Sequence, residues 1–273
     1  MAEDNPPEST SAQGDFHDLG QILVVIPTYN EKGNVELITG RVRRALPEVH
    51  VLVVDDNSPD GTGEIADQLA AVDDHIHVMH RLGKDGLGAA YIAGFQWALH
   101  NSYDVVIEMD ADGSHQPEEL HKLLAALRES DLVLGSRYVP GGTTVNWPKR
   151  RNALSKGGNW YVRRVLGLDI KDVTGGYRAF RAKTLRALDL DHVGSAGYIF
   201  QVDLAYRVQK AGLRITEVPI EFHEREIGAS KMDSSIVSEA LWMVTKWGVR
   251  ERFGGRKPRK DRAAIEAPPT DRE

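Results

Sequence analysis

Short apolar runs rich in β-branched residues alternate with longer amphipathic segments along the first half of the chain. The runs at residues 22–26, 51–54, 76–79, 105–109 and 132–134 have the length and composition of strands that are buried on both faces of a sheet. When strands alternate with helices, successive strands pair in parallel, because each helix carries the chain back across the sheet. The pattern therefore predicts an α/β fold with a mostly parallel central sheet and helices on both faces.

Two amphipathic helices stand out in the sequence. Residues 118–129 follow Pro117, and their leucines recur at the spacing of one helical face, at 120, 123, 124 and 127. Residues 234–249 carry a broad apolar face with Trp242 and Trp247, and basic residues follow. We expect this second helix either to lie on an anionic membrane surface or to pack on its own domain.

Composition divides the chain into four segments. Residues 1–18 are rich in Pro, Glu and Ser and are predicted to be disordered. Residues 19–232 form the predicted α/β domain, and residues 233–253 form the amphipathic helix that is expected at the membrane. Residues 254–273 form a basic, proline-containing tail that is also predicted to be disordered.

Charge and residue usage narrow the possible classes of protein. The 273 residues carry a formal net charge of −6, which argues against a nucleic-acid binder, and they include no cysteine, which excludes disulfides and thiolate metal sites. No apolar run approaches the roughly 18–20 residues that span a bilayer. We therefore expect a protein of a reducing compartment that meets a membrane only at its surface.

Ligands of parallel α/β sheets bind at the carboxyl ends of the strands, so the residues that follow each predicted strand are the candidates for chemistry. Residues 27–31 follow the first strand and lack the GxGxxG turn of a dinucleotide-binding domain. Asp55 and Asp56 follow the second strand, as a polar turn or with one carboxylate in the cleft. Glycines surround Lys84 after the third strand in a weak phosphate-binding pattern that is not a P-loop.

The sharpest chemical feature follows the fourth strand. Asp110 and Asp112 are spaced i, i+2 directly after the apolar run, so both carboxylates can converge on a hard divalent cation. Mg²⁺ favours one or two carboxylates together with substrate phosphates over a complete protein cage. A purely structural or calcium-type Asp loop is the alternative. An uncompensated acidic pair at a sheet edge is costly without a cation, which favours the metal site.

The second half of the chain places basic residues beside glycines. Arg137 ends the fifth predicted strand, and residues 149–151 precede a helical segment that contains Ser155 and Lys156. These residues suggest a second anionic ligand, distinct from the one that binds through the metal. A solvated run of charges is the alternative, above all for Lys149 and Arg150.

Taken together, these motifs resemble the inverting GT-A glycosyltransferases of family 2 and, more closely, the dolichol- or polyprenol-phosphate mannose synthases. The resemblance runs from about residue 22 to residue 248. It is carried by segments 27–31, 54–56, 110–112, 135–138 and 198–201 and by Arg225 with Ser230 and Lys231. The first-strand motif and the DxD motif specify only the superfamily, whereas the last two segments narrow the match to polyprenyl-phosphate glycosyl transfer.

The resemblance implies roles for individual residues. Asp110 and Asp112 would bind Mg²⁺ or Mn²⁺, and Asp112 and Arg137 would be the catalytic residues. Ser114 stands where some relatives have a metal-binding glutamine. Arg137, Arg151 and Ser155 would bind the acceptor phosphate. The implied donor site consists of Pro27, Tyr29, Glu31, Val54, Asp56, Lys84, Asp110, Ala111, Asp112, Ser114, Arg137, Gln201, Arg225 and Lys231.

The implied activity is transfer of mannose from GDP-mannose to a polyprenyl monophosphate, with inversion to the β-anomer. The implied location is the cytoplasmic face of a membrane, as a peripheral protein with a possible integral-membrane partner. A polyprenyl-phosphate glucosyltransferase that uses UDP-glucose is an alternative. A second alternative is a phosphotransferase of the haloacid dehalogenase type, although there the DxD motif follows the first strand and here it follows the fourth.

Overall fold

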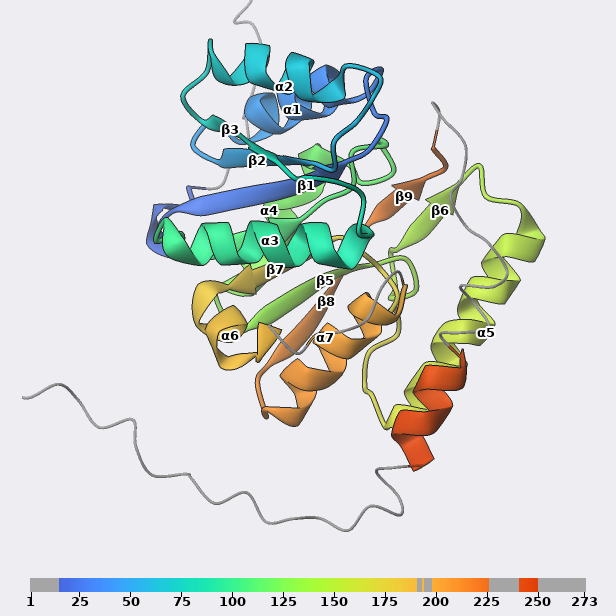
Figure 1. Cartoon of the computed structure of the whole chain (residues 1–273). Helices are drawn as coiled ribbons and strands as arrows, with labels where there is room; N and C mark the ends of the chain where they lie inside the picture. Colours follow the sequence, from blue (N-terminus) through green and yellow to red (C-terminus); the bar gives the residue numbers. More distant parts are fainter. Residues whose placement is uncertain (1–14, 191–192, 194–197, 226–240, 250–273) are drawn as a thin grey trace, which may run out of the picture.

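The computed structural model describes residues 15–190, 193, 198–225 and 241–249, and its centre is a seven-stranded sheet in the order β3-β2-β1-β4-β7-β5-β8 (Figure 1). The five predicted strands are confirmed as β1 to β5, and the predicted fold class is confirmed with them. The strands are β1 Ile22–Thr28, β2 His50–Asp55, β3 Ile76–His80, β4 Val105–Glu108, β5 Leu132–Ser136, β6 Thr143–Val145, β7 Arg178–Arg181, β8 Ile215–Pro219 and β9 Glu221–His223.

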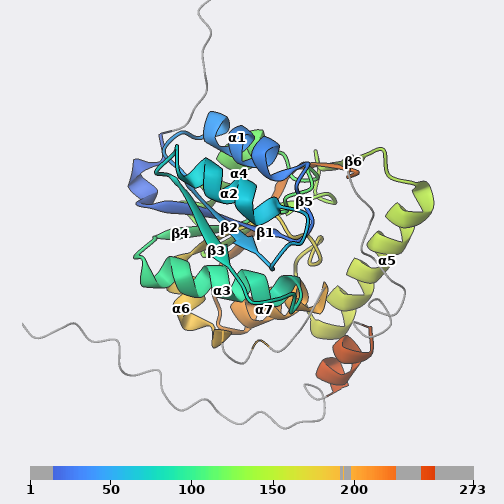
Figure 2. The ribbon, with the colours of Figure 1, turned by 45° about the horizontal axis from the view of Figure 1, so that its top comes forward.

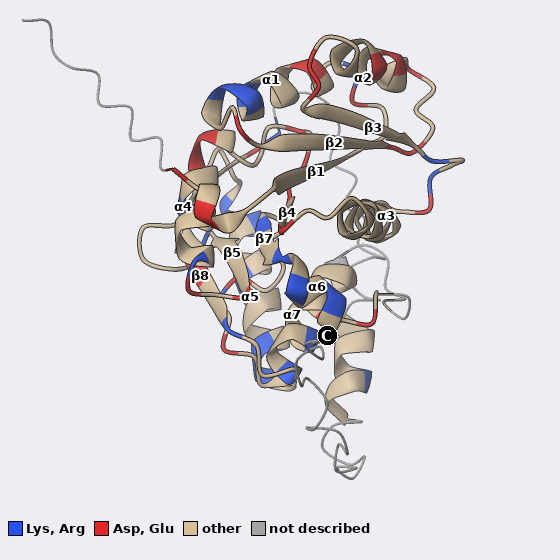
Figure 3. Ribbon diagram, turned by 90° about the vertical axis from the view of Figure 1, so that its left-hand side faces the viewer, with Lys and Arg blue, Asp and Glu red and all other residues tan. Residues whose placement is uncertain are grey.

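Helices cover both faces of the sheet. Alternate residues of a strand point to opposite faces. Accordingly, Val24 and Ile26 pack in the core with α1, α2 and α4, whereas Leu23 and Val25 pack in the core with α3, α6 and α7. Figure 3 shows α2 and α6 on opposite sides of the sheet. The helices are α1 Val35–Ala45, α2 Thr62–Ala70, α3 Leu87–His100, α4 Leu120–Leu127, α5 Lys149–Leu166, α6 Ala182–Ala187 and α7 Tyr198–Lys210, with 3-10 turns η1 His17–Leu19 and η2 Pro117–Glu119.

Strand β7 departs from the parallel pattern. It lies between β4 and β5 and is antiparallel to both. Its register places Arg178 opposite Glu108 of β4, so two charged side chains face each other inside the sheet. The sequence analysis did not predict this strand, because two arginines in four residues hide its apolar character.

A small second sheet extends the carboxyl edge of the main one. Strand β6 pairs in parallel with β9, and α5 follows β6 and runs along the side of the molecule (Figures 1 and 2). A helix at residues 241–249 lies against the C-terminal half of α5, where the hydroxyls of Tyr161 and Thr245 are 2.6 Å apart. In the part of the chain that the structure describes, no helix has the length and apolar character to cross a membrane.

The predicted helix at 118–129 is confirmed as η2 followed by α4, with Pro117 at its start and the four leucines buried. The described structure begins at Asp15, and Phe16 is buried beside Arg128. Residues 1–14, 226–240 and 250–273 lie outside the described structure. The predicted segment boundaries at 18, 232 and 253 therefore stay predictions.

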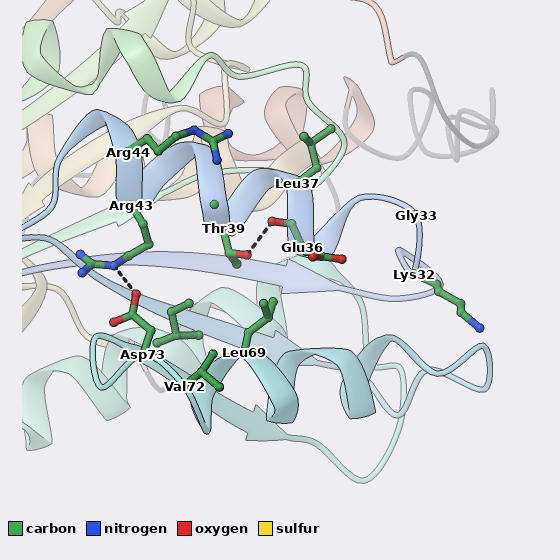
Figure 4. A pocket seen from close by; sticks show the side chains of 12 residues that line it. Lys32, Gly33, Glu36, Leu37, Thr39, Arg43, Arg44, Leu69, Val72 and Asp73 are labelled. Atoms are coloured by element: carbon green, nitrogen blue, oxygen red, sulfur yellow. Dashed lines mark hydrogen bonds and ion pairs between the residues drawn. The ribbon is translucent and has the colours of Figure 1, made fainter.

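A groove of about 550 Å³ lies between α1 and α2, on the outer helical layer (Figure 4). Its walls combine exposed apolar side chains with charged ones, and none of the predicted site residues lines it. The lining residues are Lys32, Gly33, Glu36, Leu37, Thr39, Gly40, Arg43, Arg44, Leu69, Val72, Asp73 and Ile76.

Candidate active site

The carboxyl ends of β1 and β2 bring the first predicted donor residues together. Pro27 is the register partner of Val54, and Thr28 is the register partner of Asp55. Asp55 is buried and accepts hydrogen bonds from the Thr28 hydroxyl at 2.9 Å and from the Ser58 backbone N–H at 3.0 Å. The carboxylate of Asp55 thus holds its own turn together, which leaves Asp56 as the candidate for ligand binding.

Asp56 is paired with an arginine that the sequence analysis did not single out. Arg81 Nη1 donates to Asp56 Oδ1 at 2.5 Å, and Arg81 Nη2 donates to Asp85 at 3.0 Å. Burial raises the pKa of Asp56, and the positive charge of Arg81 opposes that rise. The carboxylate is therefore held in a poorly hydrated position where a hydrogen-bond donor of a ligand would be bound strongly.

Two further predicted donor residues meet beside this pair. The Lys84 ammonium lies over the Tyr29 ring, 4.2 Å from the ring centroid. Glu31 is buried, its side chain accepts a hydrogen bond from Asn34 at 2.7 Å, and its backbone N–H donates to the Thr62 hydroxyl at 3.0 Å. The predicted donor residues of β1, β2 and the Lys84 loop thus form one side of a common site.

Asp110 is held from two directions. The hydroxyl of Tyr91 on α3 donates to Asp110 Oδ1 at 3.2 Å, and the backbone N–H of Asp110 donates to His115 Nδ1 at 3.1 Å. His115 is buried and its ring stacks on Tyr177 with 4.8 Å between centroids. Burial raises the pKa of Asp110 and lowers that of His115. Because Nδ1 accepts this bond, His115 is neutral and fixes the backbone of the acidic loop.

Asp112 contacts a cationic side chain from a distant part of the chain. The backbone N–H of Ser114 donates to Asp112 Oδ1 at 3.0 Å, and Arg225 approaches Oδ2 with Nε at 2.9 Å and Nη2 at 2.8 Å. Burial acts to raise the pKa of Asp112, but the hydrogen bonds of Ser114 and the charge of Arg225 prevail and lower it. Asp112 is therefore a carboxylate at neutral pH.

A buried arginine and a buried glutamate lie together beneath the acidic loop. Arg178 is fully buried and donates to the backbone oxygens of Val173, Gly175 and Gln201 at 2.7–2.8 Å. Its Nε is 3.9 Å from Glu108 Oε2. Burial raises the pKa of Glu108 to about 8 and lowers that of Arg178 to about 10. This pair joins β4, β7 and the start of α7 directly under the site.

The donor set at the loop fits a divalent cation that is shared with a substrate. Among the described residues no three His, Asp or Glu side chains converge on one point, so Asp110 and Asp112 are the two protein carboxylates available. Next to them, the Ser114 hydroxyl and the Gln201 amide supply further buried oxygens. Two carboxylates with buried oxygens nearby match the preference of Mg²⁺ or Mn²⁺ for a few protein oxygens plus phosphate.

Arg137 is engaged by a carboxylate of its own. Its Nε and Nη2 donate to the two oxygens of Asp172 at 2.7 and 2.6 Å, and its backbone N–H also donates to Oδ2 at 2.9 Å. The guanidinium carbon also lies 5.2 Å from the centroids of the Trp147 and Phe222 rings. The fork of Arg137 is thus used by Asp172, and its roles in catalysis and phosphate binding stay predictions.

Arg151 and Ser155 lie one turn apart near the start of α5. Arg151 Nη1 donates to Glu224 at 3.1 Å, and its guanidinium lies over the Trp147 ring at 4.3 Å. The hydroxyl of Tyr138 donates to Ser155 Oγ at 2.7 Å. The predicted acceptor residues thus form a cationic and hydroxyl-bearing surface that Tyr138 and Trp147 support.

Strand β9 ties the acidic loop to this basic surface. The backbone N–H of His223 donates to the Ser114 carbonyl at 3.1 Å, and that of Glu224 donates to the Val145 carbonyl just before α5, also at 3.1 Å. The acidic loop and the basic surface are therefore both bound by consecutive residues at the end of β9.

The structure places every predicted site residue except Lys231, which lies outside the described residues. Sequence reasoning missed the partners that hold them, namely Arg81, Tyr91, Asp172 and Glu224. Of these, Asp172 and Glu224 carried a signal, because Asp172 opens a glycine-rich and basic segment at 172–178 and Glu224 lies in a second such segment, beside Arg225. Arg81 and Tyr91 follow no motif, and their roles depend on contacts between distant segments.

Comparison with known proteins shows the family to which the chain belongs. A family model described as glycosyl transferase family 2 matches residues 23–189. An undecaprenyl-phosphate mannosyltransferase of Micrococcus luteus is 58% identical over 239 residues, which are 88% of this chain and 98% of the relative. A polyprenol monophosphomannose synthase of Mycolicibacterium smegmatis is 58% identical over 233 residues, which are 85% of this chain and 88% of the relative.

A solved structure shares the fold at low sequence identity. Glucosyl-3-phosphoglycerate synthase of Mycobacterium tuberculosis, in complex with Mn²⁺, UDP and glucosyl-3-phosphoglycerate, superposes with a TM-score of 0.62 at 19% identity. The match covers 94% of this chain and 88% of the other. At this identity the likeness shows the fold alone.

Proposed function

The chain belongs to glycosyl transferase family 2 and within it to the polyprenol-phosphate mannose synthases, and on this premise we propose that it transfers mannose from GDP-mannose to a polyprenyl monophosphate at a membrane surface. The product is β-mannosyl phosphoryl polyprenol. A haloacid-dehalogenase-type phosphotransferase is set aside, because the family match covers residues 23–189 and the DxD motif follows β4.

One observation carries this proposal. The acidic loop of Asp110 and Asp112 and the end of β6, which leads into the basic start of α5, are bound to consecutive backbone N–H groups of the β9 end, at His223 and Glu224. A site of this kind can hold a cation-bound diphosphate on one side and a second anion on the other. A phosphate that attacks a sugar nucleotide presents this pair of anionic groups.

The donor half of the site serves the departure of GDP. Negative charge grows on the leaving diphosphate, and a divalent cation held by Asp110 and Asp112 would neutralise part of it as a Lewis acid. Arg225 adds a guanidinium at the same loop, where it contacts Asp112. Asp56 and Arg81 would orient the guanine base, and Tyr29 and Lys84 would line the nucleotide pocket.

The acceptor half of the site needs no strong base. A phosphate monoester has a second pKa of about 6, so it is mostly dianionic near neutral pH and is already a nucleophile. Arg151 and the hydroxyl groups of Ser155 and Tyr138 would orient the attacking oxygen. A single in-line displacement at the anomeric carbon gives the β-product from an α-linked donor.

The outer surface near the acceptor half supports an encounter with lipid. On α5, Leu154 and Trp160 are 58% and 66% exposed, and basic side chains such as Lys149 and Arg150 flank them. The neighbouring helix 241–249 exposes Trp242, with Lys246 over its ring. Exposed tryptophan and leucine among basic residues favour binding in the headgroup region of an anionic bilayer. Arg151 and Ser155 lie on this same helix.

The test is a direct assay with labelled GDP-mannose, polyprenyl phosphate in vesicles, and extraction of the lipid product into organic solvent. We expect label in the organic phase with Mg²⁺ or Mn²⁺ and none after chelation. Asp112→Ala is expected to lower transfer at least about 100-fold, the scale of a lost transition-state stabiliser. Equal labelling from UDP-glucose would contradict the proposed donor, and undiminished activity of the variant would contradict the proposed metal site.

A further inference from the structure

Glu224 and Arg225 follow the last residue of β9 and reach opposite halves of the site. Glu224 contacts Arg151 on α5, and Arg225 contacts Asp112 in the acidic loop. In extended chain, successive side chains point to opposite sides, so two neighbouring residues can contact groups on opposite sides of the backbone. The backbone N–H of His223 is bound to Ser114 and that of Glu224 to Val145, so the chain just before Arg225 is attached to both halves of the site.

Arg225 contacts the carboxylate of Asp112, which would also hold a divalent cation. Its Nε and Nη2 both approach Asp112 Oδ2, at 2.9 and 2.8 Å, and Nη2 is 3.7 Å from Glu31. A divalent cation bound to Asp112 would be repelled by a guanidinium at this distance, since like charges a few ångströms apart oppose each other strongly in a buried site. Arg225 and a metal-bound diphosphate therefore compete for this position.

Glu224 competes with the acceptor phosphate, as Arg225 competes with the metal-bound diphosphate. Its carboxylate lies 3.1 Å from Arg151 Nη1, and both side chains are about one third exposed. A phosphate dianion on Arg151 would meet the negative charge of Glu224 at the same guanidinium. Glu224 is thus an acidic residue inside a basic surface, where it occupies the position of the predicted ligand.

We propose that Glu224 is a positioning residue that competes with the acceptor phosphate for Arg151, and that the Glu224–Arg225 dipeptide thereby couples acceptor binding to binding of the metal-bound donor. This inference rests on the proposed function. Each ligand displaces one side chain of the dipeptide from its contact. Whichever ligand binds first also weakens the neighbouring contact, because the two residues share one short backbone segment.

The expected consequence is positive and reciprocal cooperativity. If one ligand has already displaced the dipeptide from its contacts, the second ligand does not have to displace it again and binds more tightly. The gain in affinity is the same whichever ligand binds first. Couplings of this kind usually change affinity by about 5-fold or more. Arg151 would thus stay paired with Glu224 until a sugar nucleotide binds.

The test measures binding, without turnover. Isothermal titration calorimetry would give the affinity of the full-length protein for a water-soluble short-chain prenyl monophosphate, alone and with saturating GDP and Mn²⁺. For the wild type we expect the affinity to rise about 5-fold or more when GDP and Mn²⁺ are present. For Glu224→Gln we expect tight binding without nucleotide and little further gain with it.

Glu221→Gln is the matched control, because Glu221 lies on β9 three residues before Glu224, is exposed and contacts His223 rather than Arg151. It is expected to retain the wild-type coupling. A merely structural role for Glu224 predicts weaker binding of the prenyl phosphate in Glu224→Gln, and this result would overturn the inference.

Equal affinities of the wild type with and without GDP and Mn²⁺ would overturn it as well. The proposed function fails differently, namely if the wild type binds GDP with Mn²⁺ but no prenyl phosphate, or binds neither of them.

Discussion

The hydroxyl of Tyr91 reaches Asp110 Oδ1 across 3.2 Å and so links α3 to the acidic loop. Tyr91 is fully buried and packs between Phe95 and Phe200, with ring centroids 6.1 Å away in each case. Its position is therefore set by the core and not by the ligand. The orientation of a predicted metal-binding carboxylate is in this way fixed by the aromatic packing beneath it.

Tyr91→Phe removes this hydroxyl and leaves the ring packing intact. We expect the concentration of Mn²⁺ that gives half-maximal transfer to rise about 10-fold, since partners of metal-binding carboxylates typically contribute on this scale. The measurement is a metal titration of initial rates at saturating substrates. Tyr161→Phe removes a hydroxyl that contacts Thr245 far from the loop and should leave the titration unchanged. The same shift in both variants would contradict the assignment.

Arg151→Ala should raise KM for the lipid acceptor more than KM for GDP-mannose. A hydrogen bond to a charged group contributes about 1.5–3 kcal/mol, so we expect the lipid KM to rise about 10-fold or more. Arg186→Ala is the control, because Arg186 is an exposed arginine on α6, outside both halves of the site. If the donor KM responds more strongly than the lipid KM, Arg151 serves the other half of the site.

A histidine cluster at the opposite edge of the sheet predicts acid sensitivity of the fold. His50 Nδ1 and His77 Nε2 are 3.0 Å apart, and the Tyr103 hydroxyl lies 2.9 and 3.2 Å from them. Burial lowers the pKa of His50 and His77 from 6.5, and the charge of His75 lowers both further, while Arg43 also lowers that of His50 and Asp73 opposes the shift.

Because the folded pKa values lie below the unfolded ones, the stabilisation is fully present above pH 6.5 and is lost as the pH falls through the folded values. Thermal unfolding between about pH 8 and pH 5 should show a falling midpoint in the acid range. His50→Asn keeps a hydrogen-bonding group near the position of Nδ1 and removes one titrating ring, so its midpoint should depend less on pH. A variant with an unchanged pH dependence would show that the cluster is not responsible.

The exposed face of α5 can be tested with a matched pair of leucines. Leu154 on α5 and Leu37 on α1 are 58% and 56% exposed, so a charged residue fits at either position. Leu154→Glu should weaken flotation with anionic vesicles about 5-fold or more, because a charge near such a surface contributes about 1 kcal/mol. Leu37→Glu should float like the wild type. Equal flotation of all three proteins would exclude α5 from the membrane contact.

The sequence predicted five of the seven strands of the main sheet and missed β7 and β8, which carry charged residues. Strands β1, β2, β4 and β5 are mostly apolar and β3 has an apolar residue at three of its five positions, whereas β7 contains Arg178 and β8 contains Glu217. Burial of Arg178 is possible only because three backbone carbonyls and Glu108 surround it. Two of those four partners, Glu108 of β4 and Gln201 of α7, come from other elements, so the local pattern around 178 carries no sign of a central strand.

Some features of the site were also visible in the sequence, whereas others depend on the folded structure. Strand-end reasoning found Asp56, Asp110 and Asp112, because a carboxyl end and an acidic residue are both visible in the sequence. The contacts that hold the site together join residues far apart, such as Asp112 with Arg225 across 113 positions and Arg151 with Glu224 across 73. Sequence spacing does not reveal such pairs, since they arise only when β9 packs beside the acidic loop.

The position of β7 also sets an order for folding during synthesis. Strand β5 pairs with β7 and β8 and not with β4, so a nascent chain that has emerged only through residue 136 has no partner for it. The first four strands can already associate at that stage, while β4 keeps an open edge until residues 178–181 leave the ribosome. An open strand edge is a template for pairing with other chains. Translation between residues 136 and 181 is therefore the interval in which this polypeptide is most exposed to aggregation and most in need of a chaperone.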